Sequence, residues 1–344
     1  MELNCPLPLH YQHIVMAHGG GGRLMQQLLE SVVQPTFSND YLNQHHDSAV
    51  FSANGRLAFT SDSYVIKPLF FKGGDIGKLA VCGTINDLAM TGAKPLFLSC
   101  SLIIEEGLPI DTLQTILKSM QQTAAEIGAF IVTGDTKVVD KGKGDGLYIN
   151  TAGIGIIETD LTIRPSSIQV GDAVIVSGDL ARHGIAVMLE REGLDFDSDI
   201  QSDCAALSPL VQDLLNANID IHCLRDLTRG GLASCLNELA KTAKVQINIE
   251  ETQIPINPAV KTACELLGFD PLYVANEGCF ALFLPQNQVE TALNSLKKHA
   301  AGQHAQHIGT VQKSHDQGIL TLSTPMGIIR VLDLLSGEQL PRIC

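Results

Sequence analysis

The sequence predicts two α+β domains in tandem. The chain has 344 residues, which is more than a single hydrophobic core usually organises. Hydrophobic residues make up 45% of it and charged residues 17%, a balance typical of globular proteins. Apolar segments with strand or helix spacing alternate along the chain, and a polar turn at residues 166–172 divides them into two sets. We therefore expect domains at residues 1–160 and 168–334, followed by a mobile C-terminal tail at residues 335–344.

The first set of segments contains three helices and four strands. Apolar residues at helical spacing predict helices at residues 24–32, 75–90 and 109–127. Pro109 suits a helix start, and Gly92 and Gly128 suit helix ends. Apolar and β-branched runs predict strands at residues 57–61, 96–104, 129–133 and 147–157. We expect the first of these strands to end at Asp62 and the third to open into a turn at residues 134–137.

The second set repeats this alternation without a short-period repeat. The same reasoning predicts strands at residues 173–177, 245–249, 272–275, 279–284, 306–311 and 328–331. It predicts helices at residues 184–191, 207–215, 229–243, 257–267 and 288–299. In this scheme Glu277 lies in a turn between two strands.

Charge and cysteine content exclude several classes of function. The net charge of −14 and the absence of tryptophan argue against a nucleic-acid partner. The nine cysteines form no C-x-x-C pair, which fits reduced thiols in the cytoplasm better than disulfides or structural zinc. The N-terminus lacks the pattern of a signal peptide, and no apolar run is long enough to span a membrane. We expect a cytoplasmic protein with no membrane association.

A glycine run near the N-terminus is a candidate phosphate-binding segment. His18 is followed by Gly19, Gly20, Gly21 and Gly22, and then by a helix. Glycine backbone allows a phosphate to approach closely, and a helix start favours negative charge. The run matches no standard nucleotide-binding loop, so taken alone a surface hinge explains it equally well.

Four aspartates stand at the ends of predicted elements beside small residues: Asp47, Asp62, Asp87 and Asp135. Asp87 is the most informative, because an unpaired carboxylate in an apolar helix is costly. Carboxylates that converge on Mg²⁺ would remove that cost and could hold a nucleoside triphosphate. The alternative is four separate caps or turn residues.

Three further charged residues belong to the same hypothesis. Lys137 follows Asp135 closely, and Glu277 is flanked by a glycine, so we expect the two to meet across an interdomain cleft as an electrostatic partner and a base. Asp226 precedes a helix, where it could cap the helix or help to build an anion site. For Lys137 and Glu277 a solvated charge is the alternative.

Cys344 is a candidate nucleophile at the end of the tail. The nine residues from Ser336 to Cys344 could span roughly 30 Å, enough to bring the sulfur into a cleft. A thiolate can carry a substrate covalently. A frayed end that happens to finish in cysteine is the alternative.

The motifs together resemble the HypE family of hydrogenase maturation proteins. This family lies within the superfamily of aminoimidazole ribonucleotide synthetase and selenophosphate synthetase. The likeness extends over nearly the whole chain, and the terminal Pro-Arg-Ile-Cys is specific to this family. It rests on these segments: Ala-His-Gly-Gly-Gly-Gly at 17–22, Thr-Ser-Asp-Ser at 60–63, Asn-Asp-Leu-Ala-Met at 86–90, Gly-Asp-Thr-Lys at 134–137, Arg-Asp-Leu-Thr-Arg-Gly-Gly at 225–231, Asn-Glu-Gly at 276–278 and Pro-Arg-Ile-Cys at 341–344.

The resemblance implies a PurM-like fold whose N-terminal ATP-binding domains pair into a shared β-barrel, and hence a homodimer. It implies that a carbamoyltransferase, HypF, loads Cys344, and that ATP then drives dehydration of the carbamoyl group to a thiocyanate. The cyano group would pass to iron on a HypC–HypD complex as a ligand of the [NiFe]-hydrogenase centre. Lys137 and Glu277 look like the catalytic residues, and Asp47, Asp62, Asp87 and Asp135 look like the carboxylates for Mg²⁺ and ATP.

Three alternatives remain open from the sequence. A small-molecule ATP-dependent synthetase or kinase of the same superfamily would share the ATP site without needing the tail thiol. Selenophosphate synthetase usually carries a reactive cysteine or selenocysteine near its N-terminus, where Cys5 is a poor substitute. A non-catalytic scaffold for metal-centre assembly would bind partners without consuming ATP.

Overall fold

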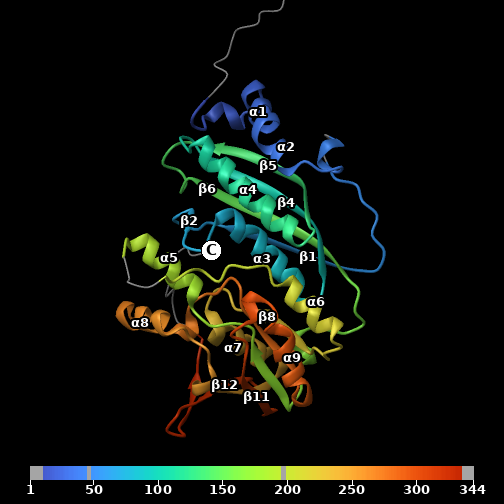
Figure 1. The fold of residues 1–344 in the computed structure, drawn as a ribbon, viewed down its shortest axis with the longest axis vertical. Helices are drawn as coiled ribbons and strands as arrows, with labels where there is room; N and C mark the ends of the chain where they lie inside the picture. The colour runs from blue at the N-terminus through green and yellow to red at the C-terminus, as the bar shows by residue number, and fades with distance from the viewer. Residues whose placement is uncertain (1–10, 45–47, 195–198, 335–344) are drawn as a thin grey trace, which may run out of the picture.

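The computed structural model describes residues 11–44, 48–194 and 199–334 (Figure 1). It confirms the two-domain α+β fold. One domain is built on a four-stranded sheet and the other on a seven-stranded sheet. The domain boundaries drawn from the sequence stay a prediction. Within the described ranges, no helix is long and apolar enough to cross a membrane.

The first domain is a four-stranded sheet covered on one face by helices α3 and α4. The strand order is β1-β6-β4-β5, with β4 and β5 parallel and the other pairs antiparallel. A small hairpin, β2–β3, precedes α3. The bounds are α1 Arg23–Leu28, the π-helical turn Leu29–Val33, α2 Gln34–Phe37, β1 Arg56–Tyr64, β2 Phe70–Phe71, β3 Gly74–Asp75, α3 Ile76–Met90, β4 Lys94–Glu105, α4 Ile110–Glu126, β5 Phe130–Val139 and β6 Leu147–Ile157.

The alternation of side chains gives this sheet one covered face and one open face. On β4, Leu98, Cys100 and Leu102 are buried in the core that α3 and α4 share with the sheet. On the opposite face large apolar side chains lie in the open, with Phe59 of β1 71% exposed and Ile103 of β4 43% exposed. An exposed apolar sheet face of this kind is typical of an interaction surface.

The second domain has helices on both faces of a seven-stranded sheet of order β13-β12-β9-β11-β7-β10-β8. All five residues of the central strand β7 are buried, because alternate side chains enter two different cores. Helices α5, α7 and α8 cover one face, and α6 and α9 cover the other. The bounds are β7 Asp172–Val176, α5 Arg182–Glu192, α6 Ser208–Asn216, β8 Cys223–Asp226, α7 Gly231–Ala243, β9 Val245–Glu250, α8 Pro258–Leu267, β10 Phe280–Pro285, α9 Val289–Leu296, β11 Gln306–Ser314, β12 Ile319–Ser323 and β13 Ile329–Leu332.

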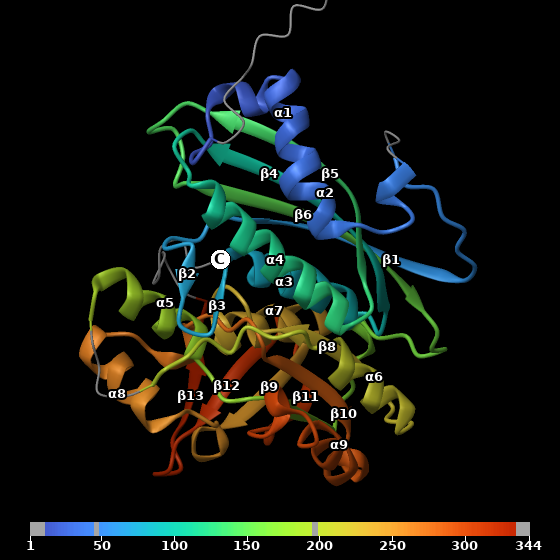
Figure 2. The ribbon, with the colours of Figure 1, turned by 45° about the horizontal axis from the view of Figure 1, so that its top comes forward.

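Helix α3 lies between the two domains (Figure 2). Its side chains join the core of the four-stranded sheet, and Ala89 and Met90 at its end pack into the core formed with α6 and α9. The helix begins at Asp75, whose carboxylate accepts the N–H groups of Gly77 and Lys78. The residues near the end of α3 therefore face the seam between the domains.

The structure corrects two local predictions around the sequence motifs. Residues 134–137 do not form a turn but continue β5, paired in register with β4. A Cβ added at Gly134 would lie 2.0 Å from the carbonyl oxygen of Cys100, so this glycine serves close strand packing. Asp62 likewise lies inside β1 and does not end it.

A third correction concerns the loop before Glu277. Residues 272–275 do not form a strand, because Pro271 begins a 3₁₀ turn over Pro271–Tyr273 and Asp270 caps it by accepting the N–H of Leu272. Glu277 therefore lies in the loop that leads into β10. The sequence reasoning also missed strands β8 and β12, which are short and lack clear alternation.

Candidate functional site

A cleft of about 550 Å³ opens where the two domains meet. Its walls come from β1, the end of α3, the interdomain segment, β8, the loop after β8 and the first half of α7. The lining residues include Ala58, Phe59, Thr60, Asp87, Leu88, Met90, Thr91, Ile163, Arg164, Pro165, Leu224, Arg225, Asp226, Thr228, Arg229, Cys235 and Glu238. Three of the sequence motifs, at residues 60–63, 86–90 and 225–231, thus contribute to one cleft.

Asp62 and Asp87 face each other across the gap between β1 and α3. The hydroxyl of Thr60 donates a hydrogen bond of 2.7 Å to Asp87 Oδ2, which fixes this carboxylate against β1. The phenol of Tyr64 lies 3.4 Å from Asp62 Oδ2. Burial raises the pKa of Asp62, and the charge of Asp87 raises it further. The two carboxylates therefore repel each other in the free protein.

Asp226 and Glu277 extend this acidic cluster from the second domain. Burial, followed by the charge of Asp87, raises the pKa of Asp226 to about 7. Glu277 is only 3% exposed, and burial together with Asp226 and Asp203 raises its pKa well above the usual value. A cation bound at this cluster would oppose these effects and lower the pKa of Glu277 again.

Asp87 and Asp226 line the cleft, and Asp62 and Glu277 lie next to them; we call these four carboxylates the cleft group. Their donor chemistry fits Mg²⁺. All four are carboxylates, the hard oxygen ligands that this ion prefers, and their mutual repulsion would be relieved by a cation. In the described part of the chain, no three side chains already stand in a metal-binding arrangement. The structure therefore supports carboxylate oxygens as the ligands and does not single out the individual residues that would bind the ion.

The remaining predicted residues form a second group along the edge strand β5. Lys137 Nζ lies 2.7 Å from Asp135 Oδ1, and both side chains are more than half exposed. This lysine, with the N–H of Thr136, lowers the pKa of Asp135. The glycine run packs beside them, since a Cβ added at Gly19 would lie 2.6 Å from the backbone nitrogen of Val138. We call Asp135, Lys137 and residues 18–22 the edge-strand group.

His18 has a structural role in this group. It is 4% exposed, and its Nδ1 accepts a hydrogen bond of 3.0 Å from the backbone N–H of Val15. Burial lowers its pKa. The imidazole of His18 thus fixes the backbone just before the glycine run.

The two groups lie on opposite faces of the four-stranded sheet. Asp62 pairs with Thr151, whose side chain is buried against α3. Asp135 pairs with Ser101 of β4, which in turn pairs with Asn150 of β6. The side-chain amide of Asn150 donates hydrogen bonds to the hydroxyls of Ser61 and Ser63, so this row of side chains lies on the open face. The strands β1 and β5 are three spacings apart, roughly 14 Å.

This separation corrects the expectation that Lys137 and Glu277 meet across the interdomain cleft of one chain. Lys137 is exposed beside Asp135, whereas Glu277 is buried among carboxylates on the other side of the sheet. Asp47 and Cys344 lie outside the described residues. Thr60 and Arg229 reach the cleft from within motifs identified in the sequence, and their participation was not foreseen.

Comparison with known proteins gives consistent matches. The family model of the AIR synthase related protein N-terminal domain matches residues 45–157, and that of its C-terminal domain matches residues 169–320. The carbamoyl dehydratase HypE of Cupriavidus necator is 46% identical over 341 residues, which cover 98% of this chain and 97% of that protein.

Two solved structures extend the likeness to the fold. The hydrogenase maturation protein HypE in complex with ATP matches with a TM-score of 0.93 and 43% identity, over 96% of this chain and 99% of that one. A chain from a HypE–HypF complex matches with a TM-score of 0.78 and 44% identity, over 90% of this chain and 99% of that one.

The acidic cleft should make the free protein less stable at high pH. The pKa of Asp226 is raised, so the folded state holds a proton that the unfolded state has released between about pH 4 and 7, and folding stability falls as pH rises through this window. Asp226→Asn removes this cost. Without ATP and Mg²⁺, we expect its gain in unfolding free energy over the native protein to grow by about 1–3 kcal/mol from pH 5 to pH 8. Urea titrations at the two pH values measure the difference, and a gain independent of pH would contradict the repulsion.

Proposed function

The chain belongs to the HypE family of the AIR synthase related proteins, and we propose that it uses ATP to dehydrate an S-carbamoyl group on Cys344 to a thiocyanate. The observation that carries the proposal is the acidic interdomain cleft, which is suited to Mg²⁺ and ATP, in a chain whose relatives are carbamoyl dehydratases. The match to a relative that binds ATP supports the choice of nucleotide.

The reaction needs a leaving group and a base. An amide oxygen leaves poorly, so it first attacks the γ-phosphorus of ATP and ADP departs. The C–O bond to phosphate then breaks as the carbon–nitrogen triple bond forms. Two N–H protons are lost, of which Glu277 takes one and the departing phosphate takes the other. Lys137 would stabilise the negative charge that develops on the phosphate.

The cleft group would hold the nucleotide through its metal. Asp62, Asp87 and Asp226 are the carboxylates that would bind Mg²⁺. Asp135 from the second chain of a homodimer would join them, and the sequence predicts Asp47 as a further ligand. Bound Mg²⁺ would neutralise charge on the phosphates. The protein's own contribution is to keep these carboxylates together and to bury Glu277 among them, which raises its pKa.

We further propose that the working enzyme is a homodimer with sites shared between chains. The open sheet face carries exposed apolar residues such as Phe59 and Ile103, which a second copy would cover in a shared β-barrel. Asp135 and Lys137 project from this face, away from the cleft of their own chain. Pairing of two such faces would let the edge-strand group of one chain complete the cleft group of the other.

Two partners complete the scheme. A carbamoyltransferase of the HypF type would load Cys344, and the HypE–HypF complex of a relative supports this contact. A HypC–HypD complex would receive the cyano group for the iron of a [NiFe]-hydrogenase. We place these steps in the cytoplasm, where thiols remain reduced.

The carrier role of Cys344 is tested by Cys344→Ala. The variant should fold and bind ATP like the native protein and should accept no carbamoyl group from the carbamoyltransferase. Intact-mass measurement after loading provides the readout, and Cys264→Ala, which removes a buried thiol, is the control. Stoichiometric loading of Cys344→Ala would assign the carrier to another residue, and ATP turnover without loading would favour a small-molecule synthetase or kinase.

The metal role of Asp87 is tested by Asp87→Asn, which removes a charge with little change of shape. We expect the dissociation constant for ATP, measured by calorimetry with Mg²⁺, to rise at least about tenfold, since one lost charge-assisted contact is worth about 1.5–3 kcal/mol. Asp316→Asn, at an exposed position, should leave it unchanged. Equal affinities for both variants would remove Asp87 from the metal site.

The shared site is tested by mixing two inactive variants. Lys137→Ala and Glu277→Gln should each accept a carbamoyl group but form no thiocyanate. If sites are shared, mixed dimers contain one site with both native residues, so random mixing restores about a quarter of the native sites. Peptide mass after ATP addition measures the thiocyanate. Thiocyanate formation after subunit exchange would support the shared site. If the mixture stays inactive, both residues belong to the site of one chain.

A further inference from the structure

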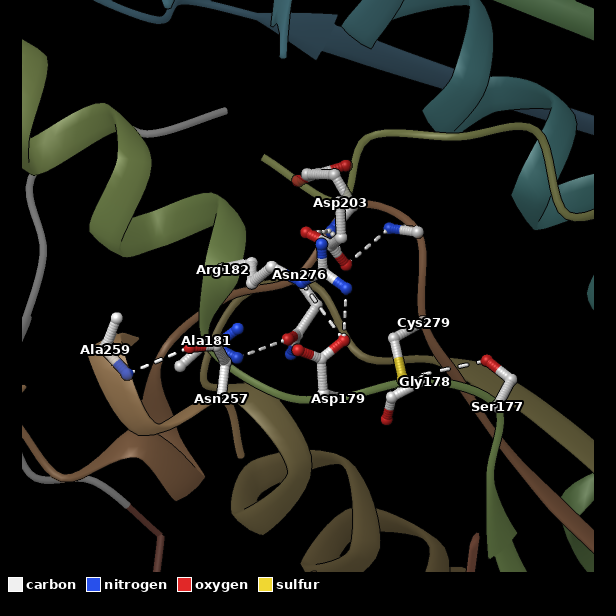
Figure 3. Close-up of polar contacts among 12 residues, drawn as sticks. Ser177, Gly178, Asp179, Ala181, Arg182, Asp203, Asn257, Ala259, Asn276 and Cys279 are labelled. Atoms are coloured by element: carbon white, nitrogen blue, oxygen red, sulfur yellow. Dashed lines mark hydrogen bonds and ion pairs between the residues drawn. The ribbon is translucent and has the colours of Figure 1, made fainter. Parts of the chain in front are cut away.

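The backbone around Glu277 is held by a carboxylate from a distant segment. Asp203, in the stretch between α5 and α6, accepts the N–H of Glu277 at 3.2 Å from each of its two oxygens. Its Oδ2 also accepts the N–H of Gly278 at 2.9 Å. Figure 3 shows Asp203 above Asn276, with its side chain in the same cluster as Arg182 and Asp179. Two successive peptide groups, on either side of the Glu277 α-carbon, thus converge on one carboxylate.

The first domain holds the same residue from the other side. The side-chain amide of Asn86 in α3 donates to the carbonyl oxygens of Ala205 at 3.0 Å and of Glu277 at 3.4 Å. Its own oxygen accepts the N–H of Leu207 at 2.8 Å. Asn86 is 2% exposed and directly precedes Asp87. The carbonyl and the N–H of Glu277 are therefore both occupied, one from each side of the seam.

Packing leaves little freedom for this arrangement to change. A Cβ added at Gly278 would lie 1.8 Å from the carbonyl oxygen of Asp203, so the two backbones are in direct contact. The neighbouring Asn276 has no exposed surface. Its side-chain oxygen accepts the N–H of Ala181, and its side-chain nitrogen donates to the carbonyl oxygen of Leu227. Arg182 adds positive charge beside Asp203, while Arg182 itself is paired with Asp179.

We propose that Asp203 is a positioning residue that fixes Glu277 for proton removal, acting through the backbone of Glu277 and not on the substrate. This inference rests on the proposed function, in which Glu277 is the base. Both carboxylate oxygens of Asp203 already accept N–H groups of Glu277 and Gly278, so we assign this side chain no contact with the nucleotide. Its contribution should therefore appear in the rate of dehydration and not in binding, because a displacement of about 1 Å of a catalytic group can cost 10²-fold in rate.

The test compares Asp203→Ala, Asp203→Asn and the control Asp179→Asn in full-length protein loaded by the carbamoyltransferase. Asp179 is a buried carboxylate of the same cluster, 6% exposed, which accepts hydrogen bonds from Arg182 and does not hold the backbone of Glu277. Single-turnover dehydration is followed by peptide mass after ATP addition. Calorimetry gives the ATP affinity, and thermal unfolding checks the fold.

We expect Asp203→Ala to slow dehydration by about 10–100-fold, with carbamoyl occupancy and ATP affinity within about twofold of the native protein. Asp203→Asn keeps one oxygen acceptor and should recover part of the rate, and Asp179→Asn should keep the native rate. If the alanine variant does not fold, the asparagine variant decides, with a loss of more than about threefold expected.

A native rate in Asp203→Ala, or in Asp203→Asn when the alanine variant does not fold, would overturn the proposal. Loss of ATP affinity in the same proportion as the rate would also overturn it, because that pattern indicates general disruption of the site. The Glu277→Gln variant distinguishes the two assignments. Normal dehydration in Glu277→Gln would show that Glu277 is not the base. No dehydration in Glu277→Gln together with a native rate in Asp203→Ala would exclude only the positioning role of Asp203.

Discussion

The burial of helix α3 between two domains is the constraint on which the rest of the structure depends. Thirteen of its fifteen residues are buried, and Asp87 is one of the two that are not. Two glycines allow the close contacts, because a Cβ at Gly77 would lie 2.5 Å from the carbonyl oxygen of Ile116 and one at Gly83 would lie 2.2 Å from the hydroxyl of Tyr64. Glycine inside a helix costs about 1 kcal/mol relative to alanine. Here it brings β1 and α4 against the helix and places Asp87 opposite Asp62.

Most of the fold could be predicted from local patterns. The helices α3, α4 and α7 were visible in the spacing of their apolar residues, and the long strand β6 in its β-branched composition. The errors occurred where tertiary contacts override a local signal. Gly134 and Asp135 have the composition of a turn, yet pairing with β4 keeps them in a strand. Strand β8 has only four residues, and the sheet around it, more than its sequence, makes it a strand.

The site could be predicted only in part. Residue type identified the carboxylates, because an aspartate in an apolar helix requires a partner. Sequence spacing could not show from which face of the sheet each carboxylate projects. Asp62 and Asp135 project from opposite faces, and only the strand register reveals this. Asp203 gave no signal at all, since it acts through main-chain contacts with residues more than seventy positions away. The raised pKa of Glu277 likewise depends on neighbours that only the fold brings together.

The contact between Gly278 and the backbone of Asp203 has a consequence for how the chain tolerates change. No side chain fits at residue 278, although this residue carries no functional group of its own. Any replacement must push Asp203 away and so displace Glu277, the residue before the glycine. In a survey of variants scored by enzyme output, this glycine would therefore be as intolerant as a residue that takes part in the chemistry. Intolerance at such a position reports on the geometry of its neighbour.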